Sequence, residues 1–299
     1  MKRLLLIAIL VVSANLAIAQ PVSQPGAPAS IASAGPVALP PAGDDPLGGT
    51  TVLSNGTVDI GVSNGGTLIN GGLGGSSLTG LRLTADPGSE AVDVAARCEG
   101  WGVAAVNLAV EGGVSGCSGA FDAEVPTGSF SSTADTAHSI TMVPSIADPI
   151  LRVEHAFSPS SNPNLFLIEV TITNVGALAI DEIQYRRSVD WDVPPTPFQE
   201  MVTVDGTSGN LLFAAGGDNG FITPEILSDS FYDLGNGCGA PDFTDCGPAD
   251  HGAVIDVSLG SLQPGEGVMV NLYYGVAGGA TTIDTFAGTP QDSSGWTAT

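Results

Sequence analysis

The sequence has very few basic residues. Only 7 of its 299 residues are Lys or Arg, against 31 Asp or Glu, which gives a formal net charge of −24. A surface this acidic repels nucleic acid and anionic membranes, so we expect neither as a partner. Two explanations of the excess acid stay open at this point. It favours solubility, for example in a salty medium, or it provides carboxylate oxygens for calcium.

Long apolar runs are missing after the N-terminus. No later stretch reaches the roughly 18 apolar residues that a membrane-spanning helix needs. At the N-terminus, basic Lys2 and Arg3 precede an apolar run at 4–12, and Ala17-Ile18-Ala19 provides the small residues of a signal-peptidase site. We therefore predict cleavage before Gln20 and no integral membrane segment afterwards. The predicted location is secreted, extracellular or at the cell surface.

Cysteine is scarce, and its count is even. Four cysteines in an exported chain indicate disulfides, for which three pairings exist. Cys98–Cys117 and Cys238–Cys246 are favoured because both pairs close short loops. Residues 239–245 carry no apolar pattern, so a disulfide there would hold a segment that the core cannot. A metal site is the weaker alternative because the sequence has no Cys-x-x-Cys pair.

Patterns for long amphipathic helices are also absent. Glycine is frequent, with 41 residues, and charged residues are only 13%. Many short alternating segments with closely spaced turns predict an all-β fold, namely a β-sandwich and specifically a large supersandwich of mainly antiparallel strands. The predicted organisation is a signal peptide at 1–19, a linker rich in Pro, Ala, Ser and Gly at 20–45, a β-sandwich domain at 46–285 and a C-terminal tail at 286–299.

The clearest strand patterns lie in the middle of the chain, at 150–157, 165–173 and 180–192. Pro194-Pro195 ends the last of them, because proline cannot continue a hydrogen-bonded ladder. The segment from Val103 to Val110 is apolar throughout and fits either a strand or a buried helical turn.

Two turns are marked by glycine. Ser63-Asn64-Gly65-Gly66 separates alternating segments, and Asn-Gly in that setting is a strong hairpin signal. Pro264-Gly265 favours a type II turn between two late strands, because glycine adopts positive φ at little cost. Residues 61–65 also match the Gly-x-Ser-x-Gly nucleophile pattern. That pattern requires a strand–turn–helix elbow, and the setting here is strand–turn–strand.

Several segments resemble known exported proteins. Residues 169–176 and the later Leu262-Gln263-Pro264-Gly265-Glu266 resemble the immunoglobulin-like modules of bacterial secreted and surface proteins. More specifically, residues 185–196 and Gly100-Trp101-Gly102 are similar to uncharacterised exported proteins of Gram-negative bacteria and cyanobacteria, many of which end in a PEP-CTERM sorting signal. The resemblance covers residues 55 to 280. It implies a supersandwich β-domain, a surface or extracellular location and no known catalytic set.

The chain departs from that pattern at its end. No apolar helix and no basic tail follow Trp296. We therefore expect either a fragment or a protein that is released rather than anchored.

Asp190 and Asp192 are the most promising ligand-binding residues. Residues two apart on a strand share one face at a separation of about 7 Å, and Arg186 and Ser188 share that face with them. Such a carboxylate pair suits glycoside hydrolysis or, with Glu200 or a backbone carbonyl, calcium binding. A structural Arg–Asp pair is the plainer alternative. Because an adjacent arginine keeps carboxylates ionised, we predict no catalytic residue.

Calcium is the one cofactor considered. Asp218, Asp242, Asp245 and Asp250 lie in segments rich in Asn and Gly and are the candidate calcium ligands. Turn chemistry explains the same residues, because Asn, Asp and Gly favour turns, and the sequence contains no Asp-x-Asp-x-Asp-Gly loop. The three histidines, His138, His155 and His251, show no metal-ligand spacing.

The function predicted from the sequence is a non-catalytic, secreted or cell-surface structural or adhesion-type protein, and not an enzyme. Its expected partners are surface or matrix glycans or other surface proteins. The alternative is a carbohydrate-binding or carbohydrate-processing β-domain, with or without calcium. This alternative rests on the occurrence of supersandwich folds in sugar enzymes. The low aromatic content of 6% argues against it.

Overall fold

The structure is a computed structural model of the chain. It describes residues 6–13, 50–68, 79–86, 88, 90–92, 99–115, 129–144, 148–192, 199–205, 211–217, 225–227 and 243–278. Within these ranges the only helical element is one 3-10 turn, η1 (Val106–Leu108), and nearly everything else is strand or turn. No helix in the described part of the chain is long and apolar enough to cross a membrane.

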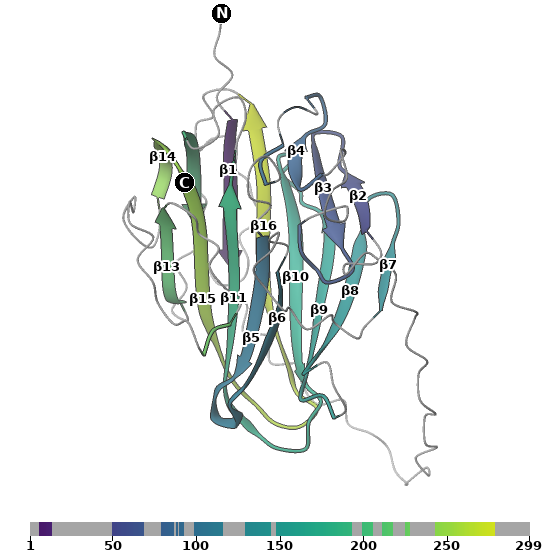
Figure 1. The fold of residues 1–299 in the computed structure, drawn as a ribbon. Helices are drawn as coiled ribbons and strands as arrows, with labels where there is room; N and C mark the ends of the chain where they lie inside the picture. Colours follow the sequence, from purple (N-terminus) through teal and green to yellow (C-terminus); the bar gives the residue numbers. More distant parts are fainter. Residues whose placement is uncertain are drawn as a thin grey trace, which may run out of the picture.

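Two large sheets form a sandwich, which confirms the predicted all-β fold of mainly antiparallel strands (Figure 1). The eight-stranded sheet has the order β14 (Phe243–Ala249), β12 (Glu200–Asp205), β1 (Leu6–Ser13), β16 (Gly267–Gly278), β10 (Leu165–Asn174), β9 (Leu151–Pro159), β8 (Ala137–Val143) and β7 (Phe130–Ser132). The five-stranded sheet has the order β13 (Leu211–Gly217), β15 (His251–Leu262), β11 (Ile180–Trp191), β5 (Glu99–Ala105) and β6 (Val110–Ser115).

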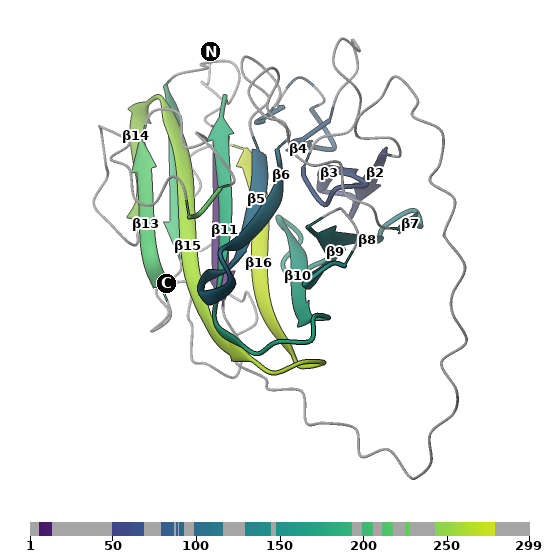
Figure 2. The same ribbon diagram turned by 60° about the horizontal axis from the view of Figure 1, so that its bottom comes forward.

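A third, small sheet contains β2 (Thr50–Ser54), β3 (Val58–Ser63) and β4 (Leu81–Leu83). It lies at the upper right of the molecule in Figure 1, next to β10 and β16. The turned view in Figure 2 shows the five-stranded sheet in front of the β16 side of the large sheet. Described neighbouring strands pair antiparallel, with one exception: β1 runs parallel to β12.

The alternation of side chains along the strands explains which residues form the core. In β9, Val153, His155 and Phe157 are buried, whereas Glu154 and Ala156 between them are partly exposed. One face of β9 therefore packs on the interior, and the other faces out. The segment from Val103 to Val110, for which strand and helical turn were both open, divides into the end of β5, the turn η1 and the start of β6.

Strand β11 departs from simple alternation, because almost every residue from Ile183 onward is buried. A strand buried on both faces carries no alternating pattern, although side chains still point to opposite faces in turn. Tyr185, Arg187 and Trp191 therefore lie on the face toward the sandwich interior. Arg186, Ser188 and Asp190 lie on the outer face. The two adjacent arginines occupy opposite faces of one strand.

The predicted turn at residues 63–66 is present and lies inside the protein. It joins no hairpin among the described residues, because β3 pairs with β2 and β4. Gly66 adopts φ +78°, as such a turn requires, and Gly65 and Gly66 are both buried. Three consecutive carbonyls of this turn accept hydrogen bonds from side chains of three strands. These bonds are Ser139 Oγ to Asn64 O, Trp101 Nε1 to Gly65 O at 2.7 Å, and Arg187 Nη1 to Gly66 O at 3.1 Å. The turn thus attaches the small sheet to both large ones.

Two segments differ from their sequence-based description. β1 falls within residues 1–19, the predicted signal peptide, whose cleavage stays a prediction. β14 begins at Phe243 and so includes the end of segment 239–245, which was expected to be a loop. The pairing of β14 with β12 holds this part of the segment in the sheet. The linker at 20–45 and the tail at 286–299 lie outside the described residues.

Candidate functional site

The outer face of β11 carries Arg186, Ser188 and Asp190 in a row, and Asp192 follows directly after the end of the strand. We call these four residues the polar face. Their exposed fractions are 0%, 0%, 8% and 2%. The strand register covers Arg186, Ser188 and Asp190, whereas Asp192 lies beyond it. Buried polar groups need partners, so the surroundings of this face decide what it can do.

Glycines flank the polar face on the neighbouring strands. Gly102 of β5 pairs with Arg186, Gly100 pairs with Ser188, and Gly252 of β15 pairs with Asp190. Glycine inside a strand often marks a place where a ligand or another backbone approaches closely. The same pattern explains Gly100-Trp101-Gly102: the tryptophan enters the interior, while both glycines face outward.

Arg186 is held rigidly. Its Nε and Nη2 donate to the two carboxylate oxygens of Asp256 on β15, at 2.7 and 2.8 Å, and Asp256 is only 1% exposed. A bidentate pair of this kind fixes the guanidinium plane. The plainer hypothesis of a structural Arg–Asp pair therefore holds for Arg186. Its partner is Asp256 on the adjacent strand, which the sequence analysis did not consider.

A short segment crosses the outer face. Arg186 Nη1 donates to the Glu225 carbonyl at 3.3 Å, and the Leu227 amide donates to Glu111 Oε2 of β6 at 2.7 Å. Ile226 between them is 3% exposed. Residues 225–227 thus reach from β11 to β6 and cover the outer face around Arg186.

Ser188 lies in the middle of the polar face with its hydroxyl buried. No hydrogen-bond partner for Ser188 Oγ is present among the described residues. A buried hydroxyl without a partner costs roughly 1–3 kcal/mol. A polar group from outside the described residues would therefore be stabilised here by a hydrogen bond with Ser188 Oγ.

A second polar cluster lies between the two large sheets, and no sequence pattern indicated it. Glu99 of β5 forms an ion pair with Arg187 of β11, and neither side chain is exposed. Glu99 also accepts from the Leu68 amide at 2.8 Å and from the Tyr274 hydroxyl at 3.1 Å. Arg187 lies over the Tyr274 ring, 5.6 Å from its centre. Strands from both large sheets and the chain segment after β3 therefore meet at one carboxylate.

Burial controls the protonation of this interior cluster. It raises the pKa of Glu99, against the opposing effects of Arg187 and of the Leu68 and Tyr274 donors. Burial, followed by the charge of Arg187, lowers the pKa of His155 well below its usual value, so the imidazole is neutral. His155 Nε2 lies 3.0 Å from the Tyr185 hydroxyl, and burial raises the pKa of Tyr185 to about 12. These buried, closely packed groups serve to connect the sheets.

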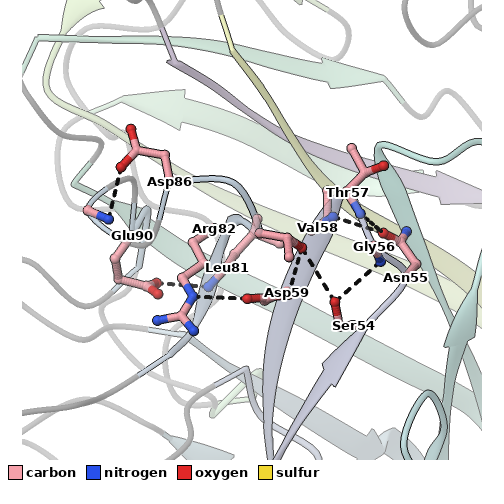
Figure 3. Close-up of polar contacts among 12 residues, drawn as sticks. Ser54, Asn55, Gly56, Thr57, Val58, Asp59, Leu81, Arg82, Asp86 and Glu90 are labelled. Carbon is pink, nitrogen blue, oxygen red and sulfur yellow. Dashed lines mark hydrogen bonds and ion pairs between the residues drawn. The ribbon is translucent and has the colours of Figure 1, made fainter.

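The small sheet has a polar group of its own (Figure 3). Asp59 accepts from Thr84 Oγ1 at 2.7 Å and from Arg82 Nε at 3.2 Å. Burial raises the pKa of Asp59, but hydrogen bonds from Ser54, Thr84 and Arg82 outweigh it and lower that pKa overall. The contacts join all three strands of this sheet, and we assign them a structural role.

A groove of about 280 Å³ lies on the eight-stranded sheet, over β7 to β10. Five of its ten lining residues are serine or threonine, and His138 and Glu169 also line it. His138 Nε2 lies 3.2 Å from Glu154 Oε2, and Arg152 Nη2 lies 2.9 Å from the same oxygen. The polar groups of the groove are spread across an open surface, whereas those of the polar face lie close together.

The other predicted site residues lie away from the polar face or outside the described residues. Glu200 is on β12 of the eight-stranded sheet, and its side chain is not described, whereas Asp190 and Asp192 are on the other large sheet. In the described part of the chain, no three His, Cys, Asp or Glu side chains are grouped to hold a metal ion. The calcium candidates fall as follows: Asp218 and Asp242 lie outside the described residues, Asp245 is in β14 without a described side chain, and Asp250 is half-buried before β15.

The disulfide predictions stay untested. Cys98, Cys117 and Cys238 lie outside the described residues, and Cys246 is in β14 without a described side chain. Ser63, the serine of the Gly-x-Ser-x-Gly match, ends β3. Its Oγ lies 2.6 Å from Thr67 Oγ1 and accepts from the Gly65 amide, as expected for a structural turn.

Comparison with known proteins gives little. No family model and no curated protein matches the chain. Among solved structures, it is similar to a protein from Escherichia coli K12 that is provisionally named as an aldose 1-epimerase. The TM-score is 0.35 and the identity 12%, over 77% of this chain and 99% of that one. A likeness of this degree locates no site in the chain.

The comparison nevertheless corrects the first prediction of function. The solved structure named above is described as an enzyme that acts on an aldose, and not as a structural or adhesion protein. On that finding the prediction of a non-catalytic structural or adhesion-type protein is wrong, and the expectation that the chain is not an enzyme is not supported.

Proposed function

We propose that the protein binds carbohydrate at the polar face of the five-stranded sheet. The observation that supports this most is the row of Arg186, Ser188 and Asp190 on β11, each with a glycine beside it on a neighbouring strand. Asp192 follows directly after the strand. Carboxylates accept hydrogen bonds from neighbouring hydroxyls of a sugar, and a serine hydroxyl both donates and accepts. The glycines carry no side chain that would stand between the sheet backbone and an approaching group.

The charge of the site favours a neutral ligand. Asp190 and Asp192 are the carboxylates of the polar face, and Glu111 borders it. The positive charge of Arg186 is balanced by Asp256. The net charge of −24 repels anions in general. A neutral, polyhydroxylated molecule is therefore a better match than a phosphate or a nucleic acid.

A glycan array with the mature chain tests this function, with Asp190→Ala and Asp192→Ala as site variants. We expect specific binding that is lost or strongly weakened in both variants. Asp181→Ala is the matched control, since Asp181 is an exposed acid at the other end of the same strand. Equal binding by all four proteins, or no binding to any glycan, would reject the proposal.

The same proteins can be tested for chemistry on the bound sugar. Asp190 and Asp192 are the groups of the polar face that could exchange protons with a sugar hydroxyl. Polarimetry of freshly dissolved aldoses measures whether the chain accelerates interconversion of the α and β anomers. Acceleration that disappears in Asp192→Ala would make the site catalytic; the spontaneous rate with retained binding would make it a binding site only.

We further propose that this binding takes place outside the cytoplasm. The support is the basic start, the apolar run at 4–12 and the small residues before Gln20. Mass spectrometry of the exported protein should show Gln20 as the first residue. An exported form that retains Lys2 and Arg3 would contradict the predicted cleavage.

A further inference from the structure

β1 occupies an internal position of the eight-stranded sheet. Residues 6–13 pair antiparallel with residues 271–278 of β16, and residues 7–11 pair parallel with 201–205 of β12. The side chains of β16 that face the interior beside it, Leu272, Tyr274 and Val276, are buried. This strand position therefore adjoins the core and connects β12 and β14 to the rest of the sheet.

The segment that fills this position is also the apolar part of the predicted signal peptide. Cleavage before Gln20 would remove it. The backbone groups of β16 and β12 would then face each other across an open strand position. Unpaired N–H and C=O groups next to a core are costly, and an open edge pairs readily with another strand. The mature protein therefore needs a replacement strand.

The chain itself continues from β16 with a sequence that fits. Gly-Gly, the dipeptide at positions 278 and 279, favours two-residue hairpin loops. A hairpin closed by these glycines pairs Ala277 with Ala280 and turns residues 280–286 back along β16. This strand would run antiparallel to β16 and parallel to β12, which are the directions that β1 has.

The side-chain alternation of this hairpin also agrees with the sheet. Its register places Thr281, Ile283 and Thr285 opposite Val276, Tyr274 and Leu272. Those three residues now pair with Ala8, Leu10 and Val12. The apolar Ile283 thus takes an inward position, and the charged Asp284 lies outward. A shift by one residue would reverse this and bury Asp284.

We propose that, after removal of residues 1–19, residues 280–286 fold back on β16 and replace β1 in the eight-stranded sheet. A strand from a second copy could pair with the same edge. The neighbouring segment has the advantage, because a two-residue loop places it beside β16 at a high effective concentration. The proposal is independent of the carbohydrate site, which lies on the other sheet.

Hydrogen exchange on the mature chain, Gln20 to Thr299, tests the proposal. In the parent mature chain, the backbone amides of residues 271–278 that face the position of β1 should be protected from exchange. In Ile283→Lys these amides should exchange at least about tenfold faster, while β9 and β10 keep their protection. Thr282→Lys is the matched control: its side chain points outward in the proposed register, so exchange should stay as in the parent chain.

Three results would overturn the proposal: fast exchange of 271–278 in the parent mature chain, equal effects of the two lysine substitutions, or protection that rises with protein concentration together with a dimer in sedimentation. The last result would assign the position to a second copy. If Ile283→Lys fails to fold, the milder pair Ile283→Ser and Phe286→Ser makes the same comparison, since Phe286 lies outward in that register.

Discussion

The guanidinium of Arg187 and the carboxylate of Glu99 form an ion pair in the interior of the sandwich, where both side chains are fully buried. Arg187 also donates to the Gly66 carbonyl, and Glu99 accepts from the Leu68 amide. The pair therefore joins two strands of the five-stranded sheet to the segment that follows β3. It is a structural centre of the protein, separate from the polar face on the other side of β11.

Breaking this pair should destabilise the protein strongly. Glu99→Gln leaves the guanidinium buried without a counter-charge, and loss of one partner of a buried pair costs about 3–5 kcal/mol. Urea denaturation followed by circular dichroism measures the free energy of unfolding. Arg152→Ala is the control, because the Arg152–Glu154 pair is partly exposed and should contribute no more than about 1 kcal/mol. Equal effects of both substitutions would contradict the role of the interior pair.

His155 should make stability depend on pH. Its pKa is lowered in the folded protein, so the unfolded chain binds the proton first as pH falls below about 6.5. The contribution of neutral His155 is complete above that pH. It is lost as pH falls toward the folded-state pKa, at up to about 1.4 kcal/mol per pH unit. His155→Gln should therefore show a smaller loss of stability than the parent chain between pH 7 and 5.

Unfolding free energies at several pH values check this difference. The pH dependence is compared between the parent chain and His155→Gln, because both contain Glu99, whose titration changes stability in the opposite direction. Its raised pKa favours the folded state as pH falls toward the ordinary glutamate value. Parallel pH profiles for the parent and His155→Gln would contradict a neutral buried histidine.

Gly66 should tolerate no side chain. Its φ is +78°, and a Cβ there would lie 2.7 Å from His155 Nδ1. Gly56 offers a matched control, because its φ is +87° but a Cβ there would meet nothing within 4 Å. Gly56→Ala should cost only the backbone penalty of about 1–2 kcal/mol. Gly66→Ala should cost that and a further 1–3 kcal/mol or so for overpacking. Thermal melts of the two variants measure the difference, and equal melting temperatures would contradict the contact.

The strands could be predicted well from local patterns. β9, β10 and β11 lie where alternation or apolar runs indicated strands, and Gly265 has the positive φ expected of the Pro-Gly turn. The glycine-marked turn at 63–66 was also recognised, but its burial was not. Turn chemistry is local, whereas the three strands that donate to this turn are far away in the sequence.

The interior cluster could not be found from spacing. Glu99 and Arg187 lie far apart in the chain, and only the register of β5 with β11 brings them together. One signal was available. Two adjacent arginines in a strand must point to opposite faces, so each needs a carboxylate of its own where both faces are buried. Asp256 and Glu99 are those carboxylates, and a sequence alone does not reveal which acids they are.

The polar face could be predicted only in part, because strand geometry groups its own residues but not their neighbours on other strands. Residues two apart on one strand share a face by geometry alone, so Asp190, Asp192 and Arg186 could be grouped from the sequence. The glycines beside them belong to other strands, and their position depends on the pairing of the sheet.

Isothermal titration calorimetry of the best glycan from the array tests the central claim most directly. The proteins are the mature chain, Asp190→Asn, Asp192→Asn and the control Glu169→Gln, whose side chain lines the groove on the other sheet. A hydrogen bond to a charged group contributes about 1.5–3 kcal/mol, so each Asn variant should bind at least about tenfold more weakly. Glu169→Gln should bind like the parent chain. Unchanged affinity in both Asn variants, or a loss confined to Glu169→Gln, would contradict carbohydrate binding at the polar face.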